Sequence, residues 1–205
     1  MHCLQSSMLL RLTEFEHGFG TRASGGVQDA AAWVRQIHSG ICLVAEEEGL
    51  AGDGDALITQ RPGLGVFVKT ADCYPVLLAD PVRGVAAAAH AGWRGTAAGI
   101  VGATLRRMKE RFGTSAADVF AAIGPGIGAC CYFVGEDVAR KFGREDAGKI
   151  DLAAANRRQL MEAGVPAEQI EVVGRCTFCD AEDFHSFRRD GERAGRMISF
   201  IRMRA

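Results

Sequence analysis

Short apolar runs separated by polar or glycine-rich turns recur along the chain. Their shortness and their flanking turns favour strands over helices. We predict an opening strand at residues 8–13 and either a short helical turn or a strand at 30–34. Further strands are predicted at 41–44, 56–59, 65–69, 76–79, 85–90, 119–123, 170–173 and 197–201. The runs at 76–79 and 85–90 are separated by a turn, Asp-Pro-Val-Arg-Gly, and predict a hairpin.

Helical spacing is confined to fewer segments. Residues 96–112 carry apolar side chains at helical intervals, with Thr96 as the expected N-cap and Gly113 as the C-terminal stop. We also predict helices at 134–142, where the first turn is acidic, and at 152–163. Because strands outnumber helices without strict alternation, we expect an α+β (mixed α/β) fold.

Length and composition narrow the class of protein. A chain of 205 residues with 48% hydrophobic content suits one domain over residues 1–205, built on central mixed β-sheets with packed helices. The formal net charge is −1, which argues against nucleic acid or an anionic membrane and favours a small-molecule substrate. No apolar run approaches the roughly 20 residues of a membrane span, so we expect a cytoplasmic protein. The pattern does not indicate an oligomeric state.

Potential metal ligands stand at the ends of apolar runs within residues 66–95. Cys73 follows the run 65–69 after Thr-Ala-Asp, and His90 closes the run 85–90, while His38 lies near a turn outside this stretch. A catalytic zinc takes three protein ligands and keeps one position open, and mixed imidazole and thiolate ligands suit it. Their spacing matches no short metal motif. The alternative is a buried thiol and two locally bonded histidines.

Seven cysteines, mostly inside apolar segments, favour reduced thiols. Cys176 and Cys179 form a CxxC pair that would suit redox or metal chemistry. A closed zinc site needs two more ligands, and we expect Cys130 and Cys131 to be poor candidates because adjacent side chains of an extended segment point apart. Buried thiols are the favoured interpretation. The zinc nucleobase deaminase signature is not matched, since Arg175 replaces its proline and no histidine has glutamate two residues on.

Basic residues lie in or beside polar loops, and they are candidates for holding a phosphate or a carboxylate, with ordinary surface solvation as the alternative. They are Arg22, Lys69, Arg94, Arg188 and Arg189. Asp72, beside Cys73, would orient a ligand, act as a general base or only cap a turn. The loop Gly-Pro-Gly-Ile-Gly at 124–128 lacks the lysine of a P-loop, so triphosphate binding is not expected.

Taken together, several blocks resemble, in order and almost end to end, the multicopper polyphenol oxidase (laccase-like) family. They are HGFGTR, QIH, GDGDALIT, KTADCYPVLLADP, AAHAGWRGTAAG, AAIGPGIGACCYFVGEDV, CT and SFRRDGERAGRMIS. The resemblance implies a metal on the histidine of QIH, the cysteine of TADC and the histidine of HAGWRG, here His38, Cys73 and His90. We expect Zn²⁺ to be bound in preference to Cu²⁺, because one three-ligand set does not provide the several copper sites of a true laccase.

Members of this family are also described as purine nucleoside phosphorylases and, in some bacteria, as a peptidoglycan editing factor. The resemblance therefore implies phosphorolysis of purine nucleosides, methylthioadenosine included, or deamination of adenosine, with Asp72, Arg94 and Arg22 as catalytic candidates. The alternatives are a hydrolase of UDP-linked muropeptides and a non-catalytic protein that binds metal or nucleosides. Two departures from the family pattern, the short segment 23–35 and His185 before the SFRR block, predict a pocket with an altered rim.

Overall fold

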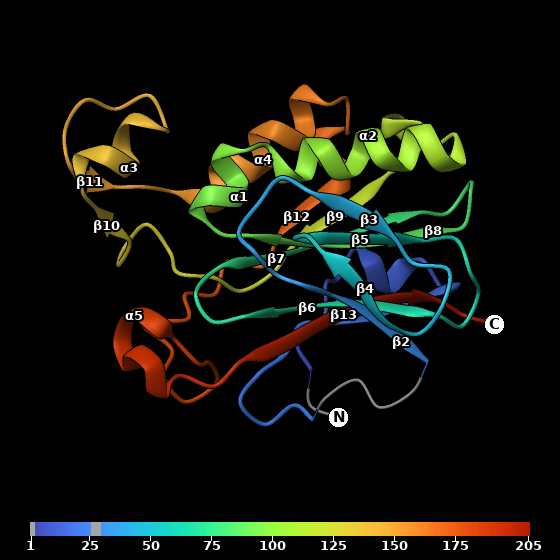
Figure 1. The fold of residues 1–205 in the computed structure, drawn as a ribbon, viewed down its shortest axis with the longest axis horizontal. Coiled ribbons are helices and arrows are strands. Elements are labelled where there is room, and N and C mark those ends of the chain that lie inside the picture. Colours follow the sequence, from blue (N-terminus) through green and yellow to red (C-terminus); the bar gives the residue numbers. More distant parts are fainter. Residues whose placement is uncertain (1–2, 26–29) are drawn as a thin grey trace.

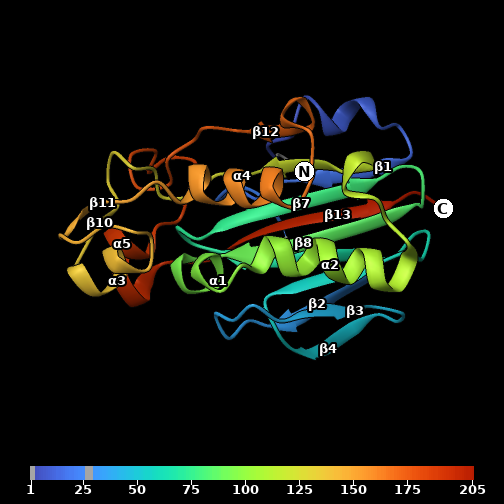
Figure 2. The same cartoon turned by 90° about the horizontal axis from the view of Figure 1, so that it is seen from above.

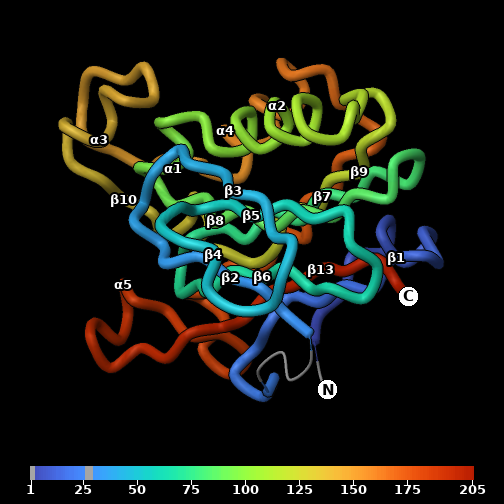
Figure 3. Tube along the Cα trace, turned by 45° about the vertical axis from the view of Figure 1, so that its right-hand side comes forward, coloured from blue at the N-terminus to red at the C-terminus, as the bar shows by residue number. Residues whose placement is uncertain are grey.

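The computed structural model of the protein describes residues 3–25 and 30–205. Within these residues the chain forms three layers, which are a set of helices, a central six-stranded sheet and a second sheet of five strands (Figure 1). Figure 3 shows the same stacking from another direction, with β5 and β8 on one side of β6 and β13. The α+β (mixed α/β) class predicted from the sequence is confirmed.

The central sheet is mixed. Its order is β12-β9-β7-β8-β5-β3, and β7 pairs antiparallel with both β8 and β9, whereas β12 runs parallel to β9 and β3 parallel to β5. The predicted hairpin is therefore present as β7 and β8. The strands are β3 (Cys42–Val44), β5 (Ala56–Thr59), β7 (Tyr74–Asp80), β8 (Val85–Ala91), β9 (Phe120–Ile123) and β12 (Ile170–Val172).

The second sheet has the order β1-β13-β6-β2-β4, and a separate pair, β10 with β11, lies outside both sheets. The segment 30–34, predicted as a helical turn or a strand, is the strand β2. The strands are β1 (Phe15–Gly18), β2 (Ala31–Arg35), β4 (Gly49–Asp53), β6 (Gly65–Thr70), β13 (Met197–Met203), β10 (Phe133–Val134) and β11 (Gly148–Lys149).

The central sheet is buried on both faces, which explains why its strands are continuous apolar runs. Successive side chains of a strand point to opposite faces. Val76 and Leu78 accordingly pack in the core that contains Ile100 of α2, whereas Leu77 packs with Val68 of the second sheet. Every residue of β7 and β8 is buried. Two cores therefore share one sheet.

Helices α2 and α4 lie across one face of the central sheet, as Figure 2 shows from above. The α-helices are α1 (Trp93–Ala97), α2 (Ile100–Phe112), α3 (Glu136–Arg140), α4 (Leu152–Glu162) and α5 (Phe187–Asp190). Short 3₁₀ helices occupy Leu9–Arg11 (η1), Ala116–Asp118 (η2), Ala167–Gln169 (η3) and Gly191–Arg193 (η4). Among the described residues no helix has the length and apolar character needed to cross a membrane.

The single helix predicted at 96–112 is wrong in its first turns. Gly99 adopts φ +73°, which ends α1 and starts α2 in a new direction. Thr96 is consequently not an N-cap. It is buried inside α1 and its hydroxyl meets the side-chain amide of Asn156 on α4. Gly113 is the predicted C-terminal stop, with φ +71°.

The opening strand predicted at 8–13 is also wrong, because η1 occupies this segment. The Ser6 hydroxyl accepts from the Leu9 N–H at 3.0 Å and donates to Glu171 at 2.7 Å, while the Met8 N–H donates to the same carboxylate at 2.8 Å. Such local side-chain bonds compete with strand pairing. The helix predicted to begin at 134 begins two residues later, since Val134 pairs with Gly148.

Candidate functional site

His38, Cys73 and His90 meet at one point, although they are far apart in sequence. His38 lies between β2 and β3, Cys73 on the crossing from β6 to β7, and His90 on β8. Their ligand atoms all lie within 4.8 Å of one another, and the two imidazole rings meet edge to face at 4.9 Å between centroids. The structure therefore brings together the three predicted metal ligands, which we call the metal triad.

The hairpin register places two of these ligands. Pro75 pairs with His90 and Tyr74 with Ala91, so Cys73 reaches the same end of the hairpin as His90. Close packing at this end needs a glycine, because a Cβ on Gly92 would stand 2.6 Å from the Cys73 sulfur. Absence of a side chain at position 92 thus makes room for the thiol.

Asp55, the residue before β5, is fully buried and orients the triad. One carboxylate oxygen accepts from the His38 N–H at 3.0 Å and meets His90 Nδ1 at 2.8 Å, and the other accepts from the Ser39 hydroxyl at 2.7 Å. Burial raises the pKa of Asp55, but the bonds from His90 and Ser39 outweigh it and lower the pKa to about 2. With Nδ1 engaged, Nε2 of His90 is the ring nitrogen left for a metal.

Asp55 was not among the residues singled out from the sequence. Two signals mark it, namely its place in the GDGDALIT block and its position directly before a buried apolar strand. A carboxylate at the start of such a strand must be hydrogen-bonded to be tolerated there.

Local electrostatics suit a bound cation. His38 has φ +58°, an unusual conformation for a residue with a side chain, and it is fixed through its N–H bond to Asp55. Burial, together with His90 and Arg94, lowers the pKa of His38 and favours the neutral imidazole that binds metals. Asp55 and Cys73 raise the pKa of His90 to about 9 against the effect of burial. Surroundings that favour a proton on His90 also favour a metal cation in its place.

A cavity of about 830 Å³ opens beside the triad. This volume is in the range of small-molecule and cofactor sites. Helices α1 and α5, which lie at the same end of the molecule in Figure 1, contribute to its wall. Its aromatic lining residues are Trp33, Trp93, Tyr132 and Phe187, and its basic ones are Arg35, Lys69, Arg94, Arg188 and Arg196.

Three of the basic residues lie against aromatic rings of the cavity wall, and one of them is Arg196, whose guanidinium lies 5.9 Å from the centroid of the Phe187 ring. The Arg94 guanidinium lies 4.2 Å from the centroid of the Trp93 ring, and that of Arg188 lies 5.2 Å from the Tyr132 ring. Arg188 also donates to the carbonyl of Phe133 at 2.9 Å. Stacking of this kind fixes the plane of a guanidinium and leaves N–H groups for an anion.

Arg22 and Arg189, two other predicted candidates, do not line the cavity. Arg22 donates to the carbonyl of Phe184 at 3.0 Å and pairs with Asp190, and Arg189 donates to loop carbonyls and to Asp190. Both arginines tie together the loops around α5. Arg35 and Arg196, by contrast, line the cavity without having been singled out from the sequence.

Asp72 lines the cavity and links the triad to the loops beyond it. It accepts from the Thr177 hydroxyl and from the Arg188 N–H, each at 2.7 Å, through different oxygens. Its φ of +82° is unusual for a non-glycine residue and turns the chain between β6 and β7. Asp72 thereby positions Arg188 and the neighbouring Cys73.

The two departures from the family pattern differ in their relation to the cavity. Trp33 and Arg35, from the short segment 23–35, form part of the wall, while 26–29 of that segment lie outside the described residues. His185 is not a lining residue. Its ring packs on Gly195, where a Cβ would stand 2.5 Å from Nε2.

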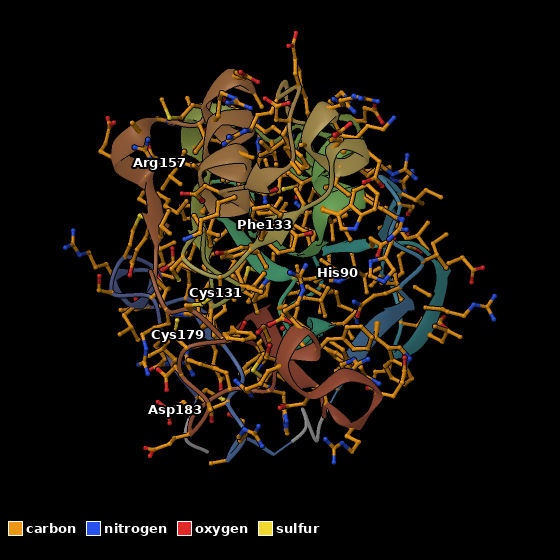
Figure 4. The ribbon with its side chains drawn as sticks, turned by 90° about the vertical axis from the view of Figure 1, so that its left-hand side faces the viewer. His90, Cys131, Phe133, Arg157, Cys179 and Asp183 are labelled. Carbon is orange, nitrogen blue, oxygen red and sulfur yellow. The ribbon has the colours of Figure 1, made fainter. Side chains whose placement is uncertain are left out.

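A second group of potential ligands lies apart from the triad. The sulfurs of Cys130, Cys131, Cys176 and Cys179, the four-cysteine cluster, all lie within 4.8 Å of one another. Figure 4 shows Cys131 and Cys179 side by side and separate from His90. The expectation that Cys130 and Cys131 point apart is wrong, because they occupy a turn in which the N–H of Cys131 bonds to the carbonyl of Gly128.

Comparison with known proteins identifies the family. A family model described as multi-copper polyphenol oxidoreductase laccase matches residues 20–204. The chain belongs to this laccase family. Among solved structures, those of YfiH from Bacillus licheniformis and YlmD from Geobacillus stearothermophilus superpose with TM-scores of 0.87 and 0.86, each at 30% identity. Each match covers 94% of this chain, with 94% of the YfiH chain and 93% of the YlmD chain.

Curated relatives within the laccase family bear enzyme names. A protein of Bacteroides thetaiotaomicron named purine nucleoside phosphorylase is 46% identical over 161 residues, 72% of this chain and 60% of its own length. One of Deinococcus radiodurans with the same name is 42% identical over 87% of this chain and 72% of its own. Adenosine deaminase RL5, from an unknown prokaryotic organism, is 38% identical over 82% of this chain and 72% of its own.

Proposed function

We propose that the protein is a zinc-dependent purine nucleoside phosphorylase whose metal is bound by His38, Cys73 and His90. The observation that carries the proposal is the convergence of these three side chains beside a cavity lined with aromatic rings and guanidinium groups. The names of the relatives from Bacteroides thetaiotaomicron and Deinococcus radiodurans support the same reaction.

The donor set fits zinc. Two imidazoles and a thiolate match its ligand preferences and leave one coordination position open. Zinc is favoured over copper because the triad offers one centre and not the several that a laccase reaction needs. When bound, zinc supplies Lewis-acid polarisation of a substrate oxygen in the cavity.

The cavity residues bind and orient the two substrates. The aromatic rings of the cavity wall, foremost Trp93, offer a flat surface for the purine. Arg94 and Arg188 present guanidinium N–H groups that hold phosphate by charge-assisted hydrogen bonds. Holding a phosphate oxygen in line with the ribose carbon lowers the barrier to displacement of the base. Asp72 acts as a positioning residue, since both its oxygens hold loop groups.

The leaving purine needs a proton donor or a hydrogen-bond donor. Burial and the nearby Cys73 raise the pKa of Tyr132 to about 12 despite the opposing effect of Arg188. Its hydroxyl therefore stays protonated at neutral pH. We assign to Tyr132 a hydrogen bond to the departing base.

Hydrolytic deamination of adenosine is a second candidate, favoured by the relative named adenosine deaminase RL5. It would use the same purine surfaces and the same metal, but water and not phosphate as the attacking group. Phosphate dependence therefore separates the two reactions.

The test is chromatography of inosine, adenosine and methylthioadenosine after incubation with the protein, with and without phosphate. We expect free base and the 1-phosphate of ribose, or of methylthioribose, only when phosphate is present. Conversion of adenosine to inosine without phosphate would establish deamination. Absence of any product from zinc-loaded protein would contradict both reactions and favour a binding protein. A parallel incubation with a UDP-linked muropeptide tests the remaining hydrolase alternative.

A further inference from the structure

We propose that the four-cysteine cluster is a second metal site, which binds one tetrahedral Zn²⁺ through Cys130, Cys131, Cys176 and Cys179. Cys179 Sγ lies 3.3 Å from the Cys131 sulfur and 3.7 Å from the Cys130 sulfur, and all four sulfurs lie within 4.8 Å. Around one zinc ion with bonds of about 2.3 Å, neighbouring sulfurs of a tetrahedron stand about 3.8 Å apart. The two measured separations lie close to that value, and the 4.8 Å limit holds for the other pairs.

The fold delivers the four thiols from two adjacent loops. Strands β9 and β12 are parallel neighbours, so the loops that follow them leave the sheet at the same edge. The loop after β9 carries Cys130 and Cys131, and the loop after β12 carries Cys176 and Cys179. A bridge between Gly126 and Cys176 and the bond from the Thr177 N–H to the Gly126 carbonyl, 3.0 Å, join these loops.

Gly128 lies against the sulfurs. Its N–H donates to Cys176 Sγ at 3.2 Å, a bond that stabilises a thiolate ligand. A Cβ at this position would stand 3.2 Å from the Cys130 sulfur and 3.5 Å from that of Cys176. A side chain at position 128 would therefore crowd two of the four sulfurs.

Two arginines hold the loop that carries Cys176 and Cys179. Arg189 donates to the carbonyls of Thr177 and Phe178, at 2.9 and 3.1 Å, and so holds the Cys176 loop with a guanidinium. Arg175, directly before Cys176, pairs with Asp180 and Asp183 and fixes the far end of this loop.

Other occupants of the cluster fit less well. A disulfide joins two sulfurs and gives the other two no reason to converge. An iron–sulfur cluster places several irons and sulfides between its cysteines. Separations below 4.8 Å among all four sulfurs leave room for one ion.

A metal in the cluster would support the cavity without touching substrate. Thr177 lies between the two cysteines of the second loop, and its hydroxyl holds Asp72, the neighbour of Cys73. Fixing the loop therefore fixes Asp72 and, through it, the N–H of Arg188. The four-cysteine site is structural, and the proposal does not depend on which reaction the triad catalyses.

Metal analysis of the purified chain tests the proposal. Protein produced with added zinc under reducing conditions is expected to contain about two zinc ions per chain. Cys176→Ser and Cys179→Ser should each contain about one zinc ion fewer, because the four-cysteine site is lost. His90→Ala should lose the zinc ion of the metal triad instead. Cys3→Ser, which lies outside both groups, should keep both zinc ions. Unchanged zinc content in both Cys176→Ser and Cys179→Ser overturns the proposal.

A spectroscopic experiment on a variant that keeps all four cysteines tests the proposal even where the cysteine variants fold poorly. His90→Ala loaded with Co²⁺ alone is expected to show the intense sulfur-to-cobalt charge-transfer and visible bands of a tetrahedral thiolate site. Titration of its thiols with a mercurial reagent should abolish these bands. The proposal is overturned if these bands are absent. It is also overturned if protein isolated under reducing conditions contains a disulfide among the four cysteines. An iron-loaded chain would show its own visible colour and overturn the assignment to zinc.

Discussion

Asp55 acts on two residues of the metal triad at once, by holding the His38 backbone and the His90 ring. Sequence motifs for metal ligands do not reveal Asp55, because a carboxylate that orients a ligand stands at no fixed distance from that ligand in the sequence. Its effect is nevertheless large in comparable sites, where removing such a partner costs about 10- to 100-fold in metal affinity.

We therefore expect Asp55→Asn to lower the zinc affinity of the metal triad by roughly 10- to 100-fold. The asparagine keeps the shape but loses the charge that stabilises the ligating imidazole. Competition with a zinc chelator measures the change. Asp53→Asn, which removes an exposed carboxylate paired with Arg35, is the matched control and should leave affinity unchanged. Equal affinity in Asp55→Asn and the control would contradict the orienting role.

Arg94 is expected to act on phosphate and not on metal. Arg94→Ala should raise the KM for phosphate by about tenfold or more, because a charge-assisted bond contributes about 1.5 to 3 kcal/mol. Zinc content should stay at the level of the unmodified protein. Steady-state kinetics with varied phosphate and metal analysis are the two measurements. Arg158→Ala, an exposed arginine on α4, serves as the control. Loss of zinc in Arg94→Ala would show a structural role instead.

At the scale of elements, the apolar runs predicted most strands, because strands buried on both faces must be apolar along their length. Strands β7 and β8 are the clearest cases. The errors occur where a local feature overrides the pattern. Gly99 divides the predicted helix, and the turn at Cys130 and Cys131 replaces an extended segment. Neither effect can be deduced from apolar periodicity, since a turn depends on backbone bonds to residues such as Gly128.

Glu171 joins β12 to the N-terminal segment and gives this contact a pH dependence. Burial raises its pKa, but the bonds from Met8, Ser6 and Ser7 prevail and lower the pKa below the ordinary value of 4.5. A lowered folded-state pKa stabilises the fold above the unfolded-state pKa, and this contribution is lost as pH falls through the folded-state value.

The prediction is that Glu171→Gln lowers the free energy of unfolding by about 1 to 2 kcal/mol at neutral pH, given partial solvent exposure. The difference from the unmodified protein should shrink as the pH falls below about 4.5. Denaturant unfolding at a series of pH values measures it. Glu168→Gln, on the neighbouring η3, is the control. A difference that persists unchanged to pH 3 would refute the assignment to this carboxylate.

The whole molecule explains why residue types and spacing left the metal triad as one of two interpretations until the family resemblance favoured it. His38 and Cys73 lie on two different connections and His90 lies on strand β8, and their meeting depends on how the two sheets stack. Spacing in the sequence carries no record of that stacking. The cavity is likewise assembled from both sheets and from α1 and α5, so Arg35 and Arg196 gave no sign of their location.

Substitution of Leu77 tests the contact between the central sheet and the second sheet. It is fully buried on the face of the central sheet that meets the second sheet. Leu77→Ala should lower the free energy of unfolding by about 2 to 5 kcal/mol through lost burial and a residual cavity. Chemical denaturation is the measurement, with Val82→Ala, an exposed turn residue, as the control. A cost below about 1 kcal/mol would mean that the two layers adjust to each other freely.

The position of β13 has a consequence for the order of folding. This strand lies between β1 and β6, although β6 precedes it by more than a hundred residues in the sequence. During synthesis strand β6 therefore lacks one of its neighbours until the ribosome has passed β13. Until then the second sheet, to which β6 contributes the buried side chains of Val66 and Val68, is incomplete. Two residues that line the cavity lie shortly before the same strand, Arg188 in α5 and Arg196 directly before β13. A nascent chain would thus complete the cavity and its second sheet in one late event.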